Sequence, residues 1–400
     1  MPRLSPAVLL LLCGLAQQVA AQQYDLRVFS VEDGLPSATV RSVTEDGQGF
    51  LWLATDGGAC RSEGRAFQTL DERLGASGSA VSTLHRSNSN ILWAGLADGG
   101  IAQWDGHRFI AFPGKLNTRV RSLLADEEGR VWACDIEGHA RVFTAEGKVV
   151  QALTDHLAQV WVNKLVADTN GDIWAGTDDG LLHYTAKAWH EVNESNGLPK
   201  ARILDLAVDS NDLLIGTTAG LVIRQGDHFA VLDSTSGLLS NRVQAVLEGR
   251  DGALWLGTPA GMVRILRRGN DPKAWRITTV TEANGLGHND VRCLYQDRSG
   301  ALWVGTAFGG VSKFVSSALA HVTERDGLRS RIVSAVRRTP DSTLWFGTYG
   351  GGVARIEGLK VHNYGMEEGL SDLFVRTLWN LPSGEVIVGT EHSGAFVLRS

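Results

Sequence analysis

A segment of about 42 residues recurs nine times along the chain, and this repeat restricts the possible folds more than any other feature. In the copy Val40–Cys60, a strand-like run is followed by a polar turn, a second run centred on Trp52 and a Gly-Gly turn. The stretch Val291–Val311 has the same order, with Trp303 in the place of Trp52. We call this place the marker position, and in chain order it holds Trp52, Trp93, Trp132, Trp174, Leu214, Trp255, Trp303, Trp345 and Ile387.

A period of this length with several short strands in each copy is the sequence signature of a β-propeller. Each copy forms a small sheet that cannot cover both of its faces alone, so the sheets stack around an axis and bury one another. The sequence therefore predicts an all-β fold, a β-propeller of four-stranded blades with nine repeats of about 42 residues and almost no helix.

The turn before the marker position has a fixed composition. Aspartate stands six residues ahead of the marker in four copies: Asp46, Asp126, Asp168 and Asp297. Glycine stands three residues ahead of it in most copies, and Gly-Thr commonly follows two residues after it. Aspartate bonds its own backbone in turns and glycine adopts positive φ, so this pattern predicts a hairpin. The small residues after the marker are expected to let neighbouring blades approach closely.

The first 21 residues have the composition of an export signal. Arg3 precedes the apolar run 7–15, and the small residues of 19–21 suit a cleavage site. We therefore assign residues 1–21 to a signal peptide and residues 22–400 to the propeller. The sequence predicts a periplasmic or secreted protein.

Several classes of function are disfavoured by composition. The formal net charge is −6 and the basic residues are spread along the chain, which argues against nucleic-acid binding. After residue 22 no apolar stretch is long enough to cross a bilayer, so we expect no transmembrane segment in the mature chain. Cys60, Cys134 and Cys293 lie in different repeats and are expected to be free and buried. No residue spacing indicates a metal site or a cofactor.

Six repeats begin with a Gly-Leu pair, and these pairs start at Gly34, Gly197, Gly237, Gly285, Gly327 and Gly369. Together with the seven tryptophans at the marker position, they resemble the two-component regulator propeller repeat. That resemblance implies the periplasmic sensor region of a bacterial receptor, often a hybrid histidine kinase. Family members usually carry further repeats in two rings, then an immunoglobulin-like domain, a membrane helix and a signalling output.

The sequence departs from this plan, because it has nine repeats and no kinase, cyclase or DNA-binding segment. The resemblance therefore implies a non-catalytic sensor that binds an oligosaccharide or another small extracytoplasmic ligand. Its output would come from a membrane histidine kinase or other signalling partner, or from a missing C-terminal part. The alternatives are a protein-docking or structural propeller of the cell envelope and, with less support, a glycan-cleaving enzyme. No isolated carboxylate pair or nucleophile motif favours the enzyme, so no catalytic residue is assigned.

The two ends of the chain suggest how the propeller closes. The run 24–30 has the composition of an outer strand, and the last repeat stops after its third strand. If the first strand completes the last blade, it also hides a sheet edge. We therefore favour a single ring of nine blades, and the alternative is seven blades plus the start of a second ring.

Candidate ligand-binding residues lie eleven positions before the marker, early on each inner strand. These positions hold Arg41, Ser82, Arg121, Asn163, Ile203, Gln244, Arg292, Ser334 and Arg376. Arginine can bind carboxylates or sulfates with two parallel hydrogen bonds, and amides can bond sugar hydroxyls. The predicted ligand-binding residues are Arg41, Arg121, Asn163, Gln244, Arg292 and Arg376. The competing interpretation is that each arginine pairs with a nearby acid and only solvates the channel.

Overall fold

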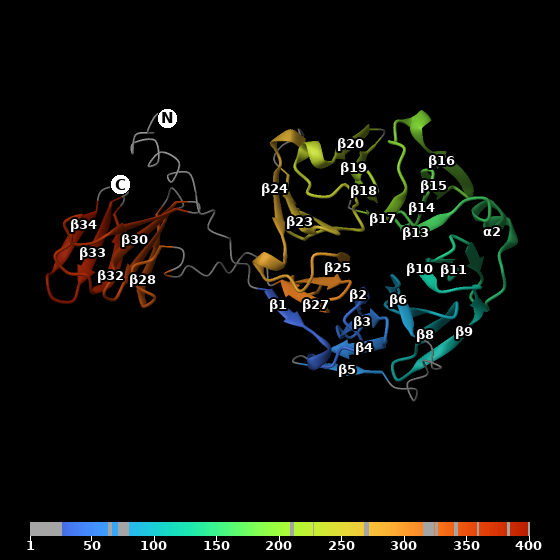
Figure 1. The fold of residues 1–400 in the computed structure, drawn as a ribbon, viewed down its shortest axis with the longest axis horizontal. Coiled ribbons are helices and arrows are strands. Elements are labelled where there is room, and N and C mark those ends of the chain that lie inside the picture. The colour runs from blue at the N-terminus through green and yellow to red at the C-terminus, as the bar shows by residue number, and fades with distance from the viewer. Residues whose placement is uncertain are drawn as a thin grey trace, which may run out of the picture. The chain divides into compact units, whose positions relative to one another are not determined.

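The computed structural model describes residues 26–62, 66–70, 80–208, 212–226, 228–267, 272–314, 324, 327–339, 343–357, 360–381 and 385–398. Within these ranges the chain forms nine small antiparallel sheets, which we number as blades in chain order (Figure 1). The predicted all-β propeller is confirmed. The predicted signal peptide lies outside the described residues.

The first four blades after strand β1 follow one another along the chain. Strand β1 is Leu26–Phe29. Blade 1 consists of β2 (Val40–Glu45), β3 (Leu51–Thr55), β4 (Gly58–Ser62) and β5 (Phe67–Thr69). Blade 2 consists of β6 (Val81–Arg86), β7 (Leu92–Leu96), β8 (Gly100–Trp104) and β9 (Phe109–Lys115). Blade 3 consists of β10 (Val120–Ala125), β11 (Val131–Asp135) and β12 (Ala140–Phe143). Blade 4 consists of β13 (Val162–Ala167), β14 (Ile173–Thr177), β15 (Leu181–Thr185) and β16 (Ala188–Val192).

The remaining blades keep the same strand order. Blade 5 consists of β17 (Ile203–Val208), β18 (Asp212–Thr217), β19 (Gly220–Gln225) and β20 (His228–Leu232). Blade 6 consists of β21 (Ala245–Glu248), β22 (Leu254–Thr258), β23 (Gly261–Leu266) and β24 (Arg276–Val280). Blade 7 contains β25 (Val291–Gln296), β26 (Leu302–Thr306) and β27 (Val311–Phe314). Blade 8 consists of β28 (Val333–Arg338), β29 (Leu344–Thr348), β30 (Gly352–Glu357) and β31 (Lys360–Tyr364). Blade 9 consists of β32 (Val375–Asn380), β33 (Val386–Thr390) and β34 (Ala395–Leu398).

Strand β1 closes blade 7, not blade 9. It pairs antiparallel with β27, from Leu26 opposite Phe314 to Phe29 opposite Val311. Blades 1 to 7 fall in one compact unit, residues 22–317, and they surround a common axis in Figure 1. Blades 8 and 9 fall in a second unit. The expectation that the N-terminal strand completes the last blade of a nine-bladed ring is therefore wrong.

The marker tryptophans are buried between blades, as predicted. Trp303 of blade 7 packs on Val40 and Leu53 of blade 1, and Phe29 of β1 stacks on its indole with ring centroids 5.7 Å apart. Similar apolar clusters fill each interface of the ring, and one more joins blades 8 and 9. The core is therefore a circle of inter-blade clusters and not a single centre.

The aspartate of the repeat turn has two functions, of which the sequence analysis identified one. In blade 1, Oδ1 of Asp46 accepts hydrogen bonds from the backbone amides of Gln48 and Phe50. Its Oδ2 accepts the indole N–H of Trp52 at 2.8 Å. The same indole bond recurs for Trp132, Trp174 and Trp303. The turn residue therefore also satisfies the one polar atom of the buried marker.

The Gly-Leu pair ends a single 3-10 turn at the start of a repeat. Such turns span Val31–Asp33, Glu194–Asn196, Ser234–Ser236 and Glu282–Asn284. Gly34 ends the first of these turns in the left-handed conformation, with φ of +96°. A residue with a Cβ is strained there. The following Leu35 is buried against the seam between blades 7 and 1.

The glycine of the Gly-Thr pair permits close contact with the next blade. A Cβ added at Gly176 would lie 2.5 Å from Cγ2 of Ile203 in blade 5. A Cβ added at Gly305 would lie 2.8 Å from Cγ1 of Val40 in blade 1. These distances confirm that small residues after the marker allow the blades to approach.

Blade 3 departs from the four-stranded pattern. Helix α2 (Gln151–Leu157) follows its third strand, and Leu153 and Leu157 pack into the cluster between blades 3 and 4. The helix therefore covers apolar surface in that cluster where other blades use an outer strand. Cys60, Cys134 and Cys293 are free thiols, as expected. Among the described residues, no helix has the length and apolarity needed to span a membrane.

Candidate functional site

Most of the predicted polar positions are β-bulge residues. In blade 1, Val40 pairs with Thr55 and Ser42 pairs with Ala54, so Arg41 is an extra residue between them. The same register shift occurs in blades 2, 3, 4, 5 and 7. A bulge re-aims a side chain, which is why bulges are common beside binding sites. Here Val40 is fully buried while Arg41 lines the axial cavities.

The position counted in blade 5, Ile203, is wrong by one residue. The turn before marker Leu214 is one residue shorter than in the other copies, so counting back eleven positions reaches the buried residue before the bulge. Ile203 is buried, and Leu204 lies at the bulge and lines both axial cavities. One of the seven bulge-level positions of the ring is therefore apolar.

Two cavities lie along the axis of the ring and share part of their lining. The channel cavity, of about 480 Å³, is lined by inner-strand residues that include Thr83, His85, Asn163, Lys164 and Asp205. The mouth cavity, of about 390 Å³, is lined by Thr39, Arg41, Asp56, Ser82, Thr83, Arg119, Val120, Arg121, Ile136, Leu204, Arg242, Gln244, Arg292, Ala307 and Phe308. Both volumes are within the range of small-molecule sites.

Of the six predicted ligand-binding residues, five line these cavities: Arg41, Arg121, Asn163, Gln244 and Arg292. Arg376 does not, because it lies on β32 of the second unit, where it pairs with Glu391 at 2.5 Å. Its placement beside Arg41 assumed a nine-bladed ring. That part of the prediction is wrong because β1 closes blade 7.

Besides Arg376, two of the predicted arginines are paired with nearby acids, as the competing interpretation expected. Arg41 forms an ion pair with Asp56, in which Nη2 donates to Oδ2 at 3.0 Å. Arg292 donates to Oδ2 of Asp290 at 2.5 Å. Both pairs are partly exposed, so solvent weakens them and they leave donors available at the mouth.

Arg121 has a different environment. It donates to Oδ1 of Asn163, and no carboxylate lies within ion-pair distance of it in the described part of the chain. Burial lowers the pKa of its guanidinium below the usual value, and the nearby charges of Arg202 and Arg242 lower it further. A partly buried cation that faces other cations favours a bound anion.

Sequence reasoning missed three arginines at the mouth. Arg119 and Arg242 stand two residues before bulge-level positions, and both line the mouth cavity. Arg202 is the corresponding residue of blade 5; it forms an ion pair with Asp178, with Nε 2.8 Å from Oδ1, and its Nη2 donates to Oδ1 of Asn163 at 3.2 Å. Arg119 reaches Asp56 only at 3.9 Å. The spacing of these residues from the bulge-level positions was the available signal.

The mouth therefore has more cations than anions. Five arginines line it, at positions Arg41, Arg119, Arg121, Arg242 and Arg292, and Arg202 lies beside Arg121 and bonds Asn163. Three carboxylates pair with them: Asp56, Asp178 and Asp290. Arg242 donates to Oε1 of Gln244 at 3.3 Å and, like Arg121, has no ion-pair partner among the described residues. The surplus positive charge is concentrated on blades 3 and 6.

An aromatic side chain completes the mouth. Phe308, in the loop after β26, is 69% exposed and lines the mouth cavity. Its ring packs edge-on against His288 at 5.2 Å between centroids. A large apolar side chain held in solvent beside polar groups suits stacking against a ligand.

The channel cavity is lined by the ion pair of Lys164 and Asp205 and by a histidine, His85. Nζ of Lys164 lies 2.7 Å from Oδ1 of Asp205, whose Oδ2 accepts the amide of Val246. His85 lines the same cavity, and its Nε2 has no partner among the described residues. Burial, with the charges of Lys164 and Arg86, lowers the pKa of His85 to about 4.

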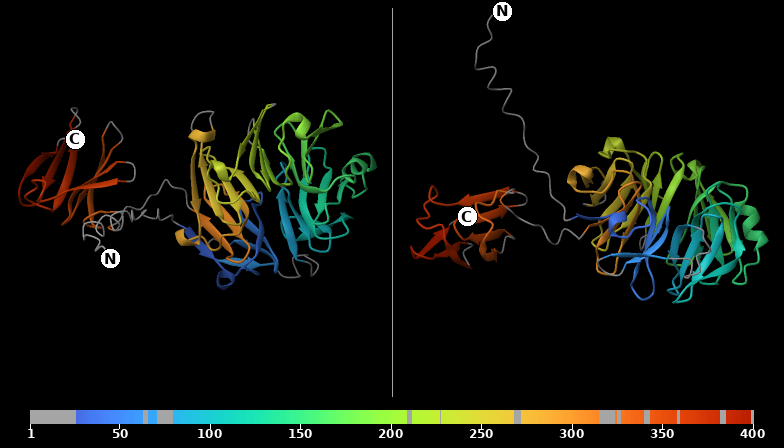
Figure 2. Two further views of the ribbon diagram at one scale, coloured as in Figure 1. Left: turned by 45° about the horizontal axis from the view of Figure 1, so that its top comes forward. Right: turned by 60° about the horizontal axis from the view of Figure 1, so that its bottom comes forward.

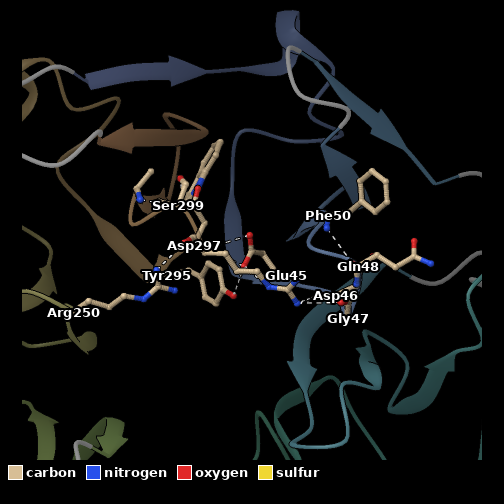
Figure 3. Close-up of polar contacts among 12 residues, drawn as sticks. Glu45, Asp46, Gly47, Gln48, Phe50, Arg250, Tyr295, Asp297 and Ser299 are labelled. Atoms are coloured by element: carbon tan, nitrogen blue, oxygen red, sulfur yellow. Dashed lines mark hydrogen bonds and ion pairs between the residues drawn. The ribbon is translucent and has the colours of Figure 1, made fainter.

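The other end of the inner strands holds a network across the seam between blades 7 and 1. Figure 3 shows Tyr295 and Glu45 pointing toward one another, and the Tyr295 hydroxyl donates to Oε2 of Glu45 at 3.3 Å. Arg298 donates its amide to the same oxygen at 3.1 Å and its guanidinium to the carbonyl of Asp46 at 3.0 Å. Arg250 of blade 6 donates to the carbonyl of Arg298. These contacts hold the seam closed.

One group of side chains has metal-ligand chemistry. Ligand atoms of Asp168, Asp172 and His183 lie within 4.8 Å of one another in blade 4. Both oxygens of Asp168 already accept bonds from the turn amides and from the indole of Trp174. The His183 ring stacks on that indole, with centroids 3.7 Å apart. The repeat turn therefore accounts for this cluster without an ion.

The fold and the axial cavities define a β-propeller with a seven-bladed ring and a polar, ligand-sized opening on its axis. The sequence model of the two component regulator propeller family matches residues 34–57, 237–260 and 285–308. The chain thus carries repeats of that family, and the resemblance drawn from its Gly-Leu pairs is confirmed. No curated protein matches the chain.

Solved structures with the same fold include extracellular domains of two-component systems. One, from a hybrid two component system of B. thetaiotaomicron, superposes with a TM-score of 0.60 at 20% identity and covers 94% of this chain and 53% of its own. A second from the same organism gives a TM-score of 0.60 at 16% identity, covering 92% and 51%. The chain spans about half the length of these domains.

The fold is also similar to that of an enzyme. Virginiamycin B lyase from Staphylococcus aureus superposes with a TM-score of 0.56 at 10% identity, covering 73% of this chain and 99% of its own. At such identities the likeness extends to the fold alone.

Proposed function

We propose that the seven-bladed ring is a periplasmic or secreted ligand-sensing module of a two-component type signalling system. In this proposal the ring binds a small oligosaccharide at the mouth cavity and has no catalytic activity of its own. Its signal passes to a membrane histidine kinase or another output protein. The family repeats and the likeness to extracellular domains of two-component systems support this assignment.

The observation that carries the ligand assignment is the combination of Arg121, Arg242 and Phe308 around one opening. Neither arginine has a carboxylate within ion-pair distance among the described residues, and the aromatic ring is exposed beside them. A sugar that carries a carboxylate or sulfate group offers an anion for the guanidinium groups and an apolar face for the ring. We therefore propose an anionic oligosaccharide.

The mouth is less suited to catalysis. Its carboxylates are each held by an arginine, as Asp56 is by Arg41 and Asp290 by Arg292. Glycoside hydrolysis needs two carboxyl groups free to act on one bond. The arrangement favours binding over proton transfer.

Calorimetric titration against sulfated, carboxylated and neutral oligosaccharides at two ionic strengths tests the proposal. Binding of the anionic sugars should weaken with salt, because charges at a partly exposed mouth are screened over about 8–10 Å. Arg121→Gln should lower the affinity by about 1.5–3 kcal/mol, the range for a hydrogen bond to a charged group. Arg242→Gln should act in the same direction.

Matched variants separate the contribution of aromatic stacking from that of charge. Phe308→Ala should weaken neutral and anionic sugars alike, because stacking does not depend on charge. Arg108→Gln, at an exposed turn of blade 2, should change nothing. A bound sugar should also raise the melting temperature by mass action. Absence of binding by any sugar, or binding that ignores both salt and Arg121, would overturn the ligand assignment and leave a docking propeller as the better interpretation.

A further inference from the structure

One position on the rim of the mouth holds a tryptophan. We define the rim position as the residue two before the bulge-level position of each ring blade, and in chain order it holds Thr39, Ala80, Arg119, Trp161, Arg202, Arg242 and Asp290. The carbonyl of Trp161 accepts the amide of Asp178 at 3.2 Å, as the carbonyl of Arg119 accepts the amide of Ile136 at 3.0 Å. Trp161 therefore lies at the same level as the arginines of the rim, and it is the one aromatic residue there.

The indole of Trp161 lies flat on a turn of blade 3. A Cβ added at Gly138 would lie 2.4 Å from Cγ, 2.5 Å from Cδ2 and 2.6 Å from Cδ1 of Trp161. Nearly equal distances to three adjacent ring atoms place that point over the face of the ring and not at its edge. Gly138 is buried, and its carbonyl accepts the amide of Val162 at 3.0 Å. One face of the indole is therefore packed, and its orientation is fixed.

The rest of the indole is open to solvent. Trp161 is 44% exposed, the largest exposure of any tryptophan among the described residues of the ring. Its indole N–H has no acceptor in the described part of the chain. A ring with one packed face, one open face and a free donor suits stacking against a ligand. Because the indole is already held in place, little side-chain entropy is lost when a ligand stacks on it.

This platform adjoins the mouth cavity. Ile136, two residues before Gly138 in the same turn, lines that cavity and is 48% exposed. Asn163, two residues after Trp161, accepts a hydrogen bond from Arg121. A ligand whose anionic group binds Arg121 can therefore extend past Ile136 onto the indole.

The turn beneath the indole does not favour an anion. Gly138 lies between Glu137 and His139, and Nδ1 of His139 is 3.7 Å from Oε2 of Glu137 and 3.5 Å from Oδ1 of Asp135. The two carboxylates would repel a negative charge, whereas they leave a neutral group unaffected. The platform therefore suits an uncharged ring with an apolar face and hydroxyl groups.

We propose that Trp161 is an outer subsite, on which a neutral sugar unit stacks while an anionic unit of the same chain binds Arg121 in the mouth. This inference rests on the proposed function and extends it. The ligand is then an oligosaccharide that leaves the mouth over blades 3 and 4 and in which charged and uncharged units follow one another. A chain too short to pass Ile136 binds at the mouth alone.

Calorimetric titration with oligosaccharides of two, four and six units, in which a uronate alternates with a neutral sugar, tests this inference. The ratio of the dissociation constants of Trp161→Ala and wild type should be about 1 for the shortest chain that binds. It should rise to roughly three to ten for the six-unit chain, the size of one aromatic contact. The ratio should not depend on salt, because the contact is uncharged. Arg121→Gln should instead weaken every length by the same factor.

Two further variants separate stacking from a structural effect. Trp161→Phe keeps an aromatic ring and should bind the six-unit chain nearly as the wild type does. Phe50→Ala removes an aromatic ring that is 39% exposed at the other end of the inner strands, and it should bind every length as the wild type does. The melting temperature of each variant checks that the ring is folded.

The outcomes distinguish this inference from the proposed function. If short chains bind through Arg121 and Trp161→Ala binds the six-unit chain as the wild type does, the proposed function stands and the outer subsite is wrong. A loss that is equal at every length, or that Trp161→Phe shows as fully as Trp161→Ala, also overturns the outer subsite. If no chain of any length binds, the proposed function fails and the outer subsite fails with it.

Discussion

The ring and the two-blade unit are built from the same repeat, yet their blades are buried to different degrees. The marker Trp345 of blade 8 is 1% exposed, like Trp52 of blade 1, because each has a following blade to pack against. Their first strands differ, because β2 is covered by blade 7 while β28 is exposed along most of its length. A repeat therefore fixes its own turns and strands, and a neighbour on each side is needed to bury both faces.

Closure of the ring depends on one short strand. Strand β1 supplies the outer strand that blade 7 lacks, and Phe29 from it stacks on Trp303 at the seam. Blade 9 has three strands among the described residues, and its outer strand β34 is largely exposed. The ring thus closes on itself, whereas blades 8 and 9 expose apolar side chains such as Val336 and Trp379 among the described residues. Four experiments can test this difference.

Deleting residues 24–30 should have the largest effect. The deletion removes β1 and exposes the seam cluster around Trp303. We expect the free energy of unfolding of the ring to fall by at least about 5 kcal/mol, since loss of one large buried side chain such as Phe29 costs about 3–5 kcal/mol. Hydrogen exchange followed by mass spectrometry should show lost protection in blades 7 and 1 and unchanged protection in blades 8 and 9. Lost protection in blade 9 instead would restore the nine-bladed closure.

Replacing a marker tryptophan by alanine should have the next largest effect on the free energy of unfolding. Trp303→Ala should destabilise the ring by about 3–5 kcal/mol as a large-to-small core substitution. Trp345→Ala should cause a comparable loss confined to blades 8 and 9. Trp189→Ala is the control, and it should cost less because Trp189 lies half-buried on the outer strand β16. Denaturant melts combined with hydrogen exchange make the measurement, and equal losses for Trp189 and Trp303 would contradict the marker assignment.

The hydrogen bond that the marker indole donates to the turn residue differs between blades 7 and 2. Changing it should have a smaller and more local effect on stability. Oδ2 of Asp297 accepts the indole N–H of Trp303 at 2.8 Å, whereas Ser87 stands at that position in blade 2 and the indole of Trp93 has no partner among the described residues. Asp297→Asn should cost about 1–3 kcal/mol, because a buried donor loses its acceptor. Ser87→Asp should stabilise blade 2 by about 0.5–1.5 kcal/mol. A destabilising Ser87→Asp change would show that the serine is better suited to its own turn.

The fourth test concerns pH. Burial holds the pKa of His85 near 4, below the ordinary 6.5. Between these values the unfolded chain binds a proton that the folded ring does not, so stability falls as pH drops from about 6.5 to about 4. His85→Gln should flatten this part of the stability curve measured by denaturant melts. A variant whose stability keeps the wild-type pH slope would show that other groups, such as carboxylates, cause it.

Part of the candidate site could be predicted from sequence. Counting back from the marker located Arg41, Arg121 and Arg292 because the hairpin has a nearly constant length. The count failed in blade 5, where a turn shorter by one residue moved the bulge to Leu204. It also did not include Arg242, which stands two residues before Gln244 and therefore outside the position that was counted. A bulge changes which of two adjacent residues faces the axis, and this is a property of strand pairing.

The sequence by itself determined the local features of this protein. The turn aspartates, the left-handed glycines, the marker tryptophans and the blade architecture follow from residue types at short, regular spacings. The tertiary structure decided which blade accepts β1, because the third strands of blades 7 and 9 each present an edge with the same backbone groups. It also decided that arginines from blades far apart in the chain meet at one mouth. Such contacts depend on where the ring closes, and the energy of closure is shared among residues that no local pattern connects.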